Sequence, residues 1–328
     1  MKNNVLFVTE GYCDGDPDKG LTNNYHNLFG SFKRSYPEIP FNVLHFDEAL
    51  VRHNTHIDKI LPVVYEKYKP NIIMMSLMGK YQGNPTLDSF KYLKDKGCKI
   101  CVHWPDTGYS DSGWGIPQIE QLGDLVDLNV SWDNPVSDFH KNYVWPKNHI
   151  NLFVPQDPKL FYKNIHQDIP ISFIGGVNNQ ERQLYLNHAI NVNKLQILVR
   201  GGQRNEKLSP EQYAQLIRRS KIGINFSFSA GSFWQTKGRV YEILACNSLL
   251  FEGANGATSK LLTSGEHYVE YSTPEDFVEK CRYYLSHEEE AKKIAAQGYK
   301  TFQEKYTAKK FWETILERIE NDRNKTIS

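Results

Sequence analysis

The chain has 328 residues, of which 40% are hydrophobic and 23% charged, the composition of a folded globular protein. This excludes disordered, collagenous and coiled-coil classes, and the length predicts about two domains. The 39 basic residues nearly balance the 38 acidic ones, so the net charge of +1 does not indicate a nucleic-acid or anionic-membrane partner.

The charge differs slightly between the two halves of the chain. Residues 1–150 have a balance of −3 and the remainder one of +4, which weakly favours an anionic ligand in the second half. The longest apolar stretches, such as residues 71–78, are far shorter than a membrane span. The N-terminus turns acidic where a signal peptide needs an apolar region, so a cytoplasmic location is expected.

The cysteines give no sign of a metal or redox centre. There are five, an odd number that argues against a disulfide framework. Cys98 and Cys101 form a CxxC pair, but the run through Cys101 reads as a strand, in which they would point to opposite faces. We therefore expect neither a metal nor a bound cofactor.

Short β-branched and aromatic runs alternate with helix-like segments, the pattern of parallel sheets built from βαβ units. The pattern occurs twice, which predicts an α/β protein with two Rossmann-like, doubly wound domains. The prolines within residues 145–170 place the boundary there, giving domains 1–150 and 151–328. Helix starts at Thr273 and Thr307 predict a helical C-terminus. The expected strands are Val5–Thr9, Phe41–Phe46, Ile72–Leu77, Ile100–His103, Leu125–Val130, Ile171–Ile174, Leu195–Val199, Ile222–Phe226, Leu249–Glu252 and Tyr268–Tyr271.

The loop after the first strand, residues 10–20, is rich in glycine and aspartate. Its glycines do not follow the dinucleotide GxGxxG spacing, and its aspartates would repel a pyrophosphate. Asp14 and Asp16 are instead candidate hydrogen-bond acceptors for the hydroxyls of an uncharged ligand, with a solvated turn as the alternative.

The end of the fourth strand places ionisable and aromatic residues together. His103 and Asp106 are candidates for a general base, and Trp104 and Tyr109 could stack on a sugar. A packed histidine at a strand end is the structural alternative. His26, which follows the first loop, is a further candidate for the same acceptor site.

The second half contains two candidate anion sites after strands. Gly175 and Gly176 lead from a strand into a polar helix start near Arg182, where free N–H groups suit a diphosphate. Arg200 ends the next strand before another pair of glycines. A tight strand-to-helix turn would also explain the glycines.

A third candidate lies in the run KGRVYEILACNSLLFE, residues 237–252. If it forms a helix and then a strand, Arg239 and Glu242 share a helical face near the N-terminus. There they could bind the phosphate and ribose of a nucleotide. A plain surface ion pair is the alternative.

This run and the segments that follow it (GANG, then LLTSGEHYVEYSTPEDFVEKCRYYL) resemble the donor domain of nucleotide-sugar glycosyltransferases of the GT-B fold. The similarity covers residues of about 170 to 315 and is greatest to the spore-maturation (CgeB-like) group, with its signature R-x-[FY]-E-x-L-A-C. The resemblance implies two Rossmann-like domains facing a cleft, with the donor sugar nucleotide in the second, the acceptor in the first, and no bound metal.

The resemblance also assigns roles to residues. Glu242 matches the glutamate that binds the donor ribose, Arg239 the arginine before it, and Lys237 lies close enough to contact the diphosphate. Relatives often carry another glutamate eight positions before the ribose-binding one, where this chain has Trp234. Gly175 and Gly176 match the donor-domain glycine turn.

These observations predict a metal-independent glycosyltransferase that moves a sugar from a nucleotide diphosphate sugar, most simply a UDP-sugar, to a hydroxyl acceptor. The acceptor class stays open among a glycan, a small metabolite, a protein and a modified base in DNA, and both inverting and retaining chemistry fit. The alternatives are a nucleotide-sugar epimerase of the same fold and a non-catalytic protein that binds sugar nucleotides or glycans.

Overall fold

The computed structural model describes residues 3–79, 81–105, 107, 115–132, 143–177, 179–201, 208–229 and 233–326, with the side chains of the last helix described up to residue 321. The chain divides into two compact units. The first comprises Met1–Pro135, Phe139–Phe153 and Lys309–Ser328, and the second comprises Val136–Asp138 and Val154–Ala308.

The first unit is built on a parallel six-stranded sheet with the order β2-β1-β3-β4-β5-β6. Alternate side chains of a strand point to opposite faces, so each face has its own core. Leu6 and Val8 belong to one apolar cluster, which includes residues of α3 (Ile57–Tyr68), α4 (Leu87–Asp95) and α5 (Ile116–Leu122). Its strands are β1 (Val5–Thr9), β2 (Phe41–His45), β3 (Ile72–Ser76), β4 (Lys99–Trp104), β5 (Leu128–Ser131) and β6 (His149–Asn151).

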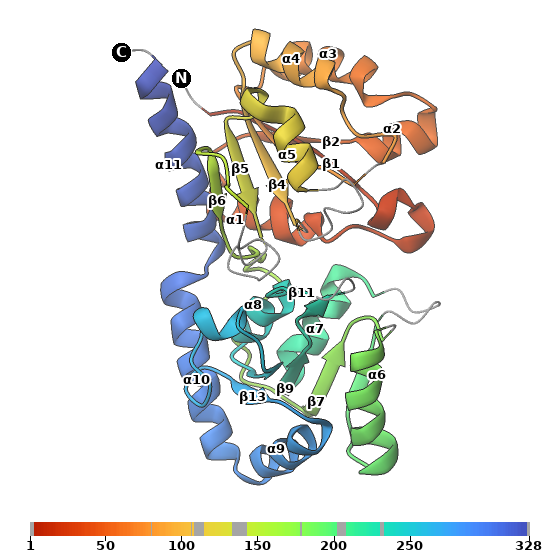
Figure 1. Ribbon diagram of the computed structural model, residues 1–328, viewed down its shortest axis with the longest axis vertical. Coiled ribbons are helices and arrows are strands. Elements are labelled where there is room, and N and C mark those ends of the chain that lie inside the picture. The colour runs from red at the N-terminus through yellow and green to blue at the C-terminus, as the bar shows by residue number, and fades with distance from the viewer. Residues whose placement is uncertain are drawn as a thin grey trace. The chain divides into compact units, whose positions relative to one another are not determined.

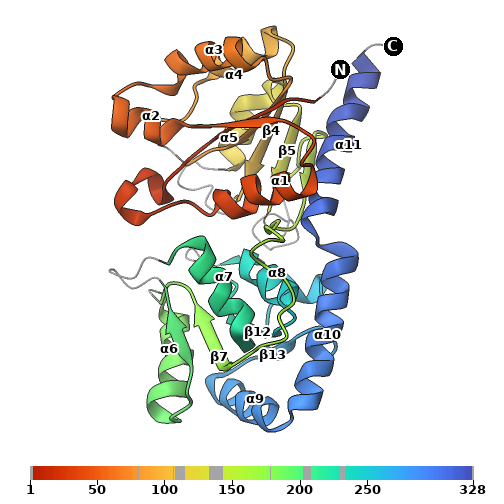
Figure 2. The same ribbon diagram turned by 180° about the vertical axis from the view of Figure 1, so that it is seen from behind.

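Helices cover both faces of this sheet, as Figures 1 and 2 show for α5 on one face and α1 on the other. The α-helices of the unit are α1 (Ser31–Ser35), α2 (Phe46–His53), α3 (Ile57–Tyr68), α4 (Leu87–Asp95), α5 (Ile116–Leu122) and α11 (Ala308–Thr326). Single turns of other helix types are η1 (Cys13–Gly15), η2 (Pro17–Lys19), η3 (Tyr25–Gly30) and η5 (Gly123–Leu125).

The last helix, α11, packs with the first unit although it follows the second in sequence. Trp312 is fully buried, its ring 5.0 Å from that of Phe32 and 6.0 Å from that of Phe7. Its Nε1–H donates to Ser31 Oγ at 2.8 Å. The expected second domain extended to residue 328, whereas the residues from Lys309 onward belong to the first compact unit.

The second unit is built on a parallel five-stranded sheet with the order β13-β12-β9-β7-β8. The connection direction reverses between β7 and β9, and in open α/β sheets ligands bind beyond the carboxyl ends of the strands at such a switch point. Its strands are β7 (Ile169–Ile174), β8 (Leu198–Arg200), β9 (Ser220–Asn225), β12 (Leu249–Gly253) and β13 (Val269–Tyr271), and a separate antiparallel pair is formed by β10 (Phe228–Ser229) and β11 (Phe233–Trp234).

One apolar cluster joins this sheet to α6, η6, α9 and α10. On the other side, α8 packs closely on β9, since a Cβ on Gly223 would lie 2.8 Å from Ile243. The helices of this unit are α6 (Gln180–Asn187), η6 (His188–Val192), α7 (Pro210–Arg219), α8 (Gly238–Ala245), η7 (Thr258–Lys260), α9 (Pro274–Ser286) and α10 (Glu288–Lys305). No helix in the described part of the chain is both long and apolar enough to cross a bilayer.

The fold confirms the expected α/β class with two parallel sheets and C-terminal helices. Most strand boundaries shift by one or two residues, and two strand starts shift by three: β5 begins at Leu128 where Leu125 was expected, and β8 begins at Leu198 where Leu195 was expected. The short strands β6, β10 and β11 were not predicted, because two or three residues carry too little alternation to be recognised.

We predict that Trp312→Ala lowers the free energy of unfolding of the first unit by about 3–5 kcal/mol, the usual cost of emptying a buried tryptophan site. Urea unfolding followed by circular dichroism measures this. Glu313→Ala, on the exposed side of the same helix, is the control and should change stability by less than about 0.5 kcal/mol. A loss below about 1 kcal/mol for Trp312→Ala would contradict the packing role of α11.

Candidate functional site

The guanidinium of Arg239 lies at the switch point of the second sheet and joins its two central strands. Nε–H donates to the carbonyl of Ile174, the last residue of β7, at 2.8 Å. An Nη1–H donates to Oδ1 of Asn225, the last residue of β9, at 2.9 Å. Arg239 therefore lies where this fold binds ligands, held by the carboxyl ends of both strands.

An aromatic ring and a glycine complete the surroundings of this guanidinium. Its Cζ lies 5.0 Å from the ring centre of Phe173, a cation–π distance. Arg182 stands near the same ring, with Cζ at 5.9 Å, and donates from Nη1 to the carbonyl of Gly176 at 2.8 Å. A Cβ on Gly175 would overlap Arg239 Nη2, so only glycine leaves room for the guanidinium. The structure thus brings Gly175, Gly176, Arg182 and Arg239 together.

Glu242 lies one turn further along α8 and is 4% exposed. Its Oε2 accepts a hydrogen bond from the hydroxyl of Tyr213, on α7, at 2.5 Å. Arg239 and Glu242 therefore do share one neighbourhood at the start of α8, as their spacing predicts. Tyr213 was not predicted, because it lies 29 residues before Glu242 in the sequence and only the fold brings the two together.

The turn before α8 is largely buried. Lys237 is the N-cap residue of α8, and its Nζ donates to Oε1 of Gln235. Thr236, which precedes it, is 3% exposed. Within the part of the chain that the structure describes, Thr236 Oγ1 has no hydrogen-bond partner. A buried hydroxyl without a partner beside a helix N-terminus is suited to a bound anion.

A buried carboxyl group lies behind Arg239. Glu252, in β12, is fully buried and accepts from Asn225 Nδ2 at 2.6 Å and from Asn255 Nδ2 at 3.0 Å. Burial is the main cause that raises its pKa from the ordinary value of 4.5 to about 7. Because Asn225 donates to Glu252, its Oδ1 is left to accept from Arg239. Neither Glu252 nor Asn225 was predicted, although a polar residue at the end of an apolar strand is a usable signal.

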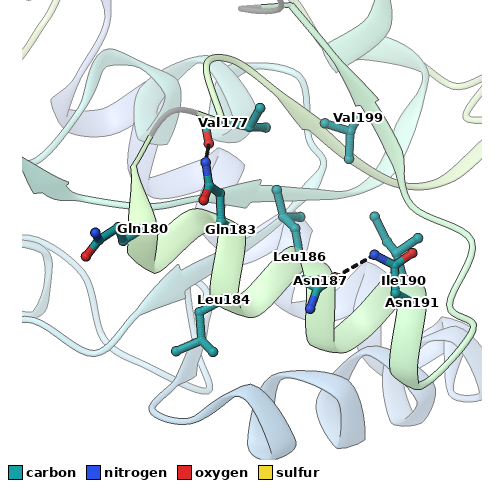
Figure 3. Close-up of a pocket in the computed structure, with 9 residues that line it drawn as sticks. All are labelled: Val177, Gln180, Gln183, Leu184, Leu186, Asn187, Ile190, Asn191 and Val199. Atoms are coloured by element: carbon teal, nitrogen blue, oxygen red, sulfur yellow. Dashed lines mark hydrogen bonds between the residues drawn. The ribbon is translucent and has the colours of Figure 1, made fainter.

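Arg200 ends β8, and its carbonyl accepts from the N–H of Gly175 at 2.8 Å, which ties the β8 end to the glycine turn. An open groove of about 620 Å³ lies on α6 and η6, next to the glycine turn (Figure 3). It is lined by Val177, Gln180, Gln183, Leu184, Leu186, Asn187, Ile190, Asn191 and Val199. None of these is charged, so the groove itself is not suited to a diphosphate.

The acceptor residues expected in the first unit are spread over different environments. Asp14 is exposed and pairs with Lys19 at 2.9 Å, while Asp16 caps the turn η2 by accepting from the N–H of Asp18. His26 is 4% exposed, within η3. Asp106 and Tyr109 lie outside the described residues.

The structure corrects the roles expected for His103 and Trp104. The His103 ring is fully buried among Trp132, Phe311 and Trp312, with ring centres 5.7–6.0 Å apart. Burial lowers its pKa to about 3, which makes it a weak base with no access to an acceptor. Trp104 is also fully buried and donates to Asn129 Oδ1 at 2.9 Å. Both are core residues, the alternative already recognised for a histidine at a strand end.

A carboxylate that the sequence analysis missed orders the first loop of this unit. Asp47 is fully buried at the start of α2 and accepts from the N–H groups of Gly11 and Tyr12, both at 2.8 Å. Asp47 thereby fixes the backbone that follows β1. Among the described residues, no group of three His, Cys, Asp or Glu side chains could hold a metal ion.

Residues 180–317 match a protein-family model described as glycosyl transferase-like. None of the curated proteins compared with the chain matches it. Among solved structures, the fold is similar to that of Anabaena Alr3699/HepE in complex with UDP and glucose, with 10% identity, coverage of 97% of this chain and 100% of that chain, and a TM-score of 0.61.

Two further structures show the same likeness. Sucrose-phosphate synthase from Thermosynechococcus elongatus has 10% identity, coverage of 99% of each chain and a TM-score of 0.60. A putative UDP-N-acetylglucosamine 2-epimerase from Listeria monocytogenes has 11% identity, coverage of 99% of this chain and 98% of that chain, and a TM-score of 0.59.

These likenesses establish the fold of the whole chain as GT-B. The glycosyl transferase-like match covers residues 180–317, most of the second unit and the start of α11, and this stretch lies largely within the expected resemblance over residues of about 170 to 315. The matched stretch contains Arg182, Arg200, Lys237, Arg239 and Glu242. Membership of the spore-maturation group stays a prediction.

We predict that Gly175→Ala lowers the free energy of unfolding by about 1–3 kcal/mol, because the new methyl group overlaps the Arg239 guanidinium. Gly176→Ala is a matched control at the next position, since a Cβ there would meet nothing within 4 Å. Urea unfolding of the two variants compares them directly. Equal stability of the two would contradict the close approach of Arg239 to the glycine turn.

We predict that Glu252 makes the protein less stable as the pH rises from about 4.5 to 7. In this range the folded carboxyl binds more protons than the unfolded one, so unfolding becomes easier with increasing pH. The raised pKa corresponds to about 3 kcal/mol. Glutamine at position 252 cannot ionise. Across this pH range, the free energy of unfolding of the wild type should therefore fall by about 3 kcal/mol relative to that of Glu252→Gln, as measured by urea unfolding. Parallel pH profiles of the two proteins would contradict the raised pKa.

Proposed function

We propose that the protein transfers a hexosyl or pentosyl group from a UDP-sugar to a hydroxyl acceptor, and that the second unit binds the nucleotide. The observation that carries this proposal is the position of Arg239 across the carboxyl ends of β7 and β9, with Glu242 on the next turn of the same helix. This arrangement provides a cation for a diphosphate and a carboxylate for ribose hydroxyls at one switch point.

The proposed diphosphate site combines charges and backbone dipoles. A guanidinium has five N–H donors, and two of those of Arg239 are bonded to Ile174 and Asn225, so donors remain that could reach phosphate oxygens. Arg182 adds a positive charge beside the Phe173 ring, which Arg239 also faces. Lys237 and the first N–H groups of α8 contribute further positive charge. Gly175 and Arg200 shape the adjacent turn.

The choice of uridine as the base rests on the similarity to HepE, whose structure holds UDP and glucose. Glu242 is proposed to accept hydrogen bonds from the ribose hydroxyls, as the family resemblance implies. The first unit is proposed to bind the acceptor, near Asp14, Asp16 and His26.

In the proposed reaction, the bond between the anomeric carbon and the diphosphate oxygen breaks while the acceptor oxygen bonds to that carbon and loses its proton. The leaving UDP gains negative charge, which the arginines and helix dipole stabilise without a resident metal ion. Asp106 stays the proposed general base for an inverting reaction. His103 is not proposed for this role, because it is buried in the core. The proposed location is the cytoplasm.

We predict that Glu242→Gln weakens UDP binding by about 10- to 100-fold, the usual effect of losing a charged hydrogen bond. Glutamine keeps the volume of the side chain and can still accept from Tyr213. Isothermal titration calorimetry measures the affinity, and thermal unfolding of the variant without ligand serves as the control for folding. An unchanged UDP affinity would contradict the ribose assignment.

Product analysis separates the proposed activity from the alternatives. Incubation with UDP-glucose and a panel of hydroxyl acceptors should release UDP and form a glycoside, detected by mass spectrometry. Release of UDP together with an epimerised free sugar would indicate an epimerase. UDP-sugar binding with neither UDP release nor a new product would favour a non-catalytic sugar-nucleotide-binding protein.

A further inference from the structure

Tyr213 contacts the carboxylate of the proposed nucleotide site. Its hydroxyl donates to Glu242 Oε2 at 2.5 Å. A tyrosine hydroxyl has a single proton, and here Glu242 receives it. Tyr213 therefore holds one of the two carboxylate oxygens of Glu242.

The pKa of Tyr213 keeps its hydroxyl a donor to Glu242. Burial and the negative charge of Glu242 raise the pKa of Tyr213 well above its ordinary value of 10.0. The hydroxyl is thus protonated under all physiological conditions and remains a donor to Glu242.

Tyr213 is mounted on a well-defined helix. Ser209 and Gln212 form a capping box at the start of α7, with hydrogen bonds of 3.2 and 2.9 Å, and Pro210 occupies its first position. The Tyr213 ring packs edge-on against the buried Phe161, with ring centres 6.1 Å apart. The hydroxyl is therefore held in place independently of any ligand.

We propose that Tyr213 is a positioning residue that orients the Glu242 carboxylate towards the ribose hydroxyls of the donor nucleotide. This inference rests on the proposed function, in which Glu242 binds the ribose and Arg239 the diphosphate. Tyr213 holds Oε2, whereas Oε1 lies towards the first turn of α8, 3.7 Å from where a Cβ on Gly238 would be. Without the hydroxyl, the carboxylate can rotate away from the direction that suits the ribose.

The positioning role of Tyr213 predicts a selective loss of affinity. A ligand that has both ribose hydroxyls and a diphosphate should lose affinity when the Tyr213 hydroxyl is removed. A ligand without ribose hydroxyls makes no use of the orientation of Glu242, so it should be affected much less. A general packing defect would weaken both ligands alike.

The test is calorimetric titration of wild type and Tyr213→Phe with UDP and with 2′,3′-dideoxy-UDP. We expect wild type to prefer UDP by about tenfold or more, the effect of about one hydrogen bond to a charged group. Tyr213→Phe should reduce this preference by about fivefold or more, with less than about a twofold change for the dideoxy ligand. In a Glu242→Gln background, Tyr213→Phe should change the preference little, because the two residues act through one another.

Tyr268→Phe is the matched control, since Tyr268 is also buried and its hydroxyl also donates to a glutamate, Glu270, at 2.9 Å. It should keep the wild-type preference. A full preference for UDP in Tyr213→Phe, or an equal loss for both ligands, would overturn the positioning role. If wild type itself does not distinguish the two ligands, the ribose assignment of the proposed function fails instead.

Discussion

The second unit depends on one cation, the guanidinium of Arg239, held across the carboxyl ends of β7 and β9. β7 and β9 end side by side at the switch point, and the polar groups at their carboxyl ends need hydrogen-bond partners. Arg239 supplies them through the Ile174 carbonyl and the Asn225 amide. The remaining features follow from its presence: residue 175 must lack a side chain, Phe173 offers the face of its ring, and Glu252 orients the amide that receives the guanidinium.

Both units use a buried carboxyl group to order the backbone or side chains at the ends of their strands, although the chemistry differs. Asp47 accepts from successive backbone N–H groups and so fixes a loop. Glu252 accepts from the side-chain amides of Asn225 and Asn255, so it fixes side chains. A carboxyl group without such donors would be costly to bury, which explains why each is surrounded by N–H groups.

The sequence predicted the parallel sheets and the placement of Arg239 and Glu242 near the start of one helix, because both follow from local periodicity along one strand or helix. It could not predict the contacts of Tyr213 or Glu252, since their partners lie 29 and 27 residues away and only the topology brings them together. For His103, the sequence suggested a functional role that the structure does not support. Its position at a strand end suggested chemistry, but α11 covers that face of the sheet with Phe311 and Trp312.

The return of α11 to the first unit also determines the order in which the protein can fold during synthesis. The ring of Trp312 packs on Phe7 and Phe32, which are translated well before it. The aromatic side of the first sheet thus stays uncovered until α11 has been made. The second unit lies almost entirely within Val154–Ala308, so its own strands and helices are available earlier. Here the domain that is translated first is the one that is completed last.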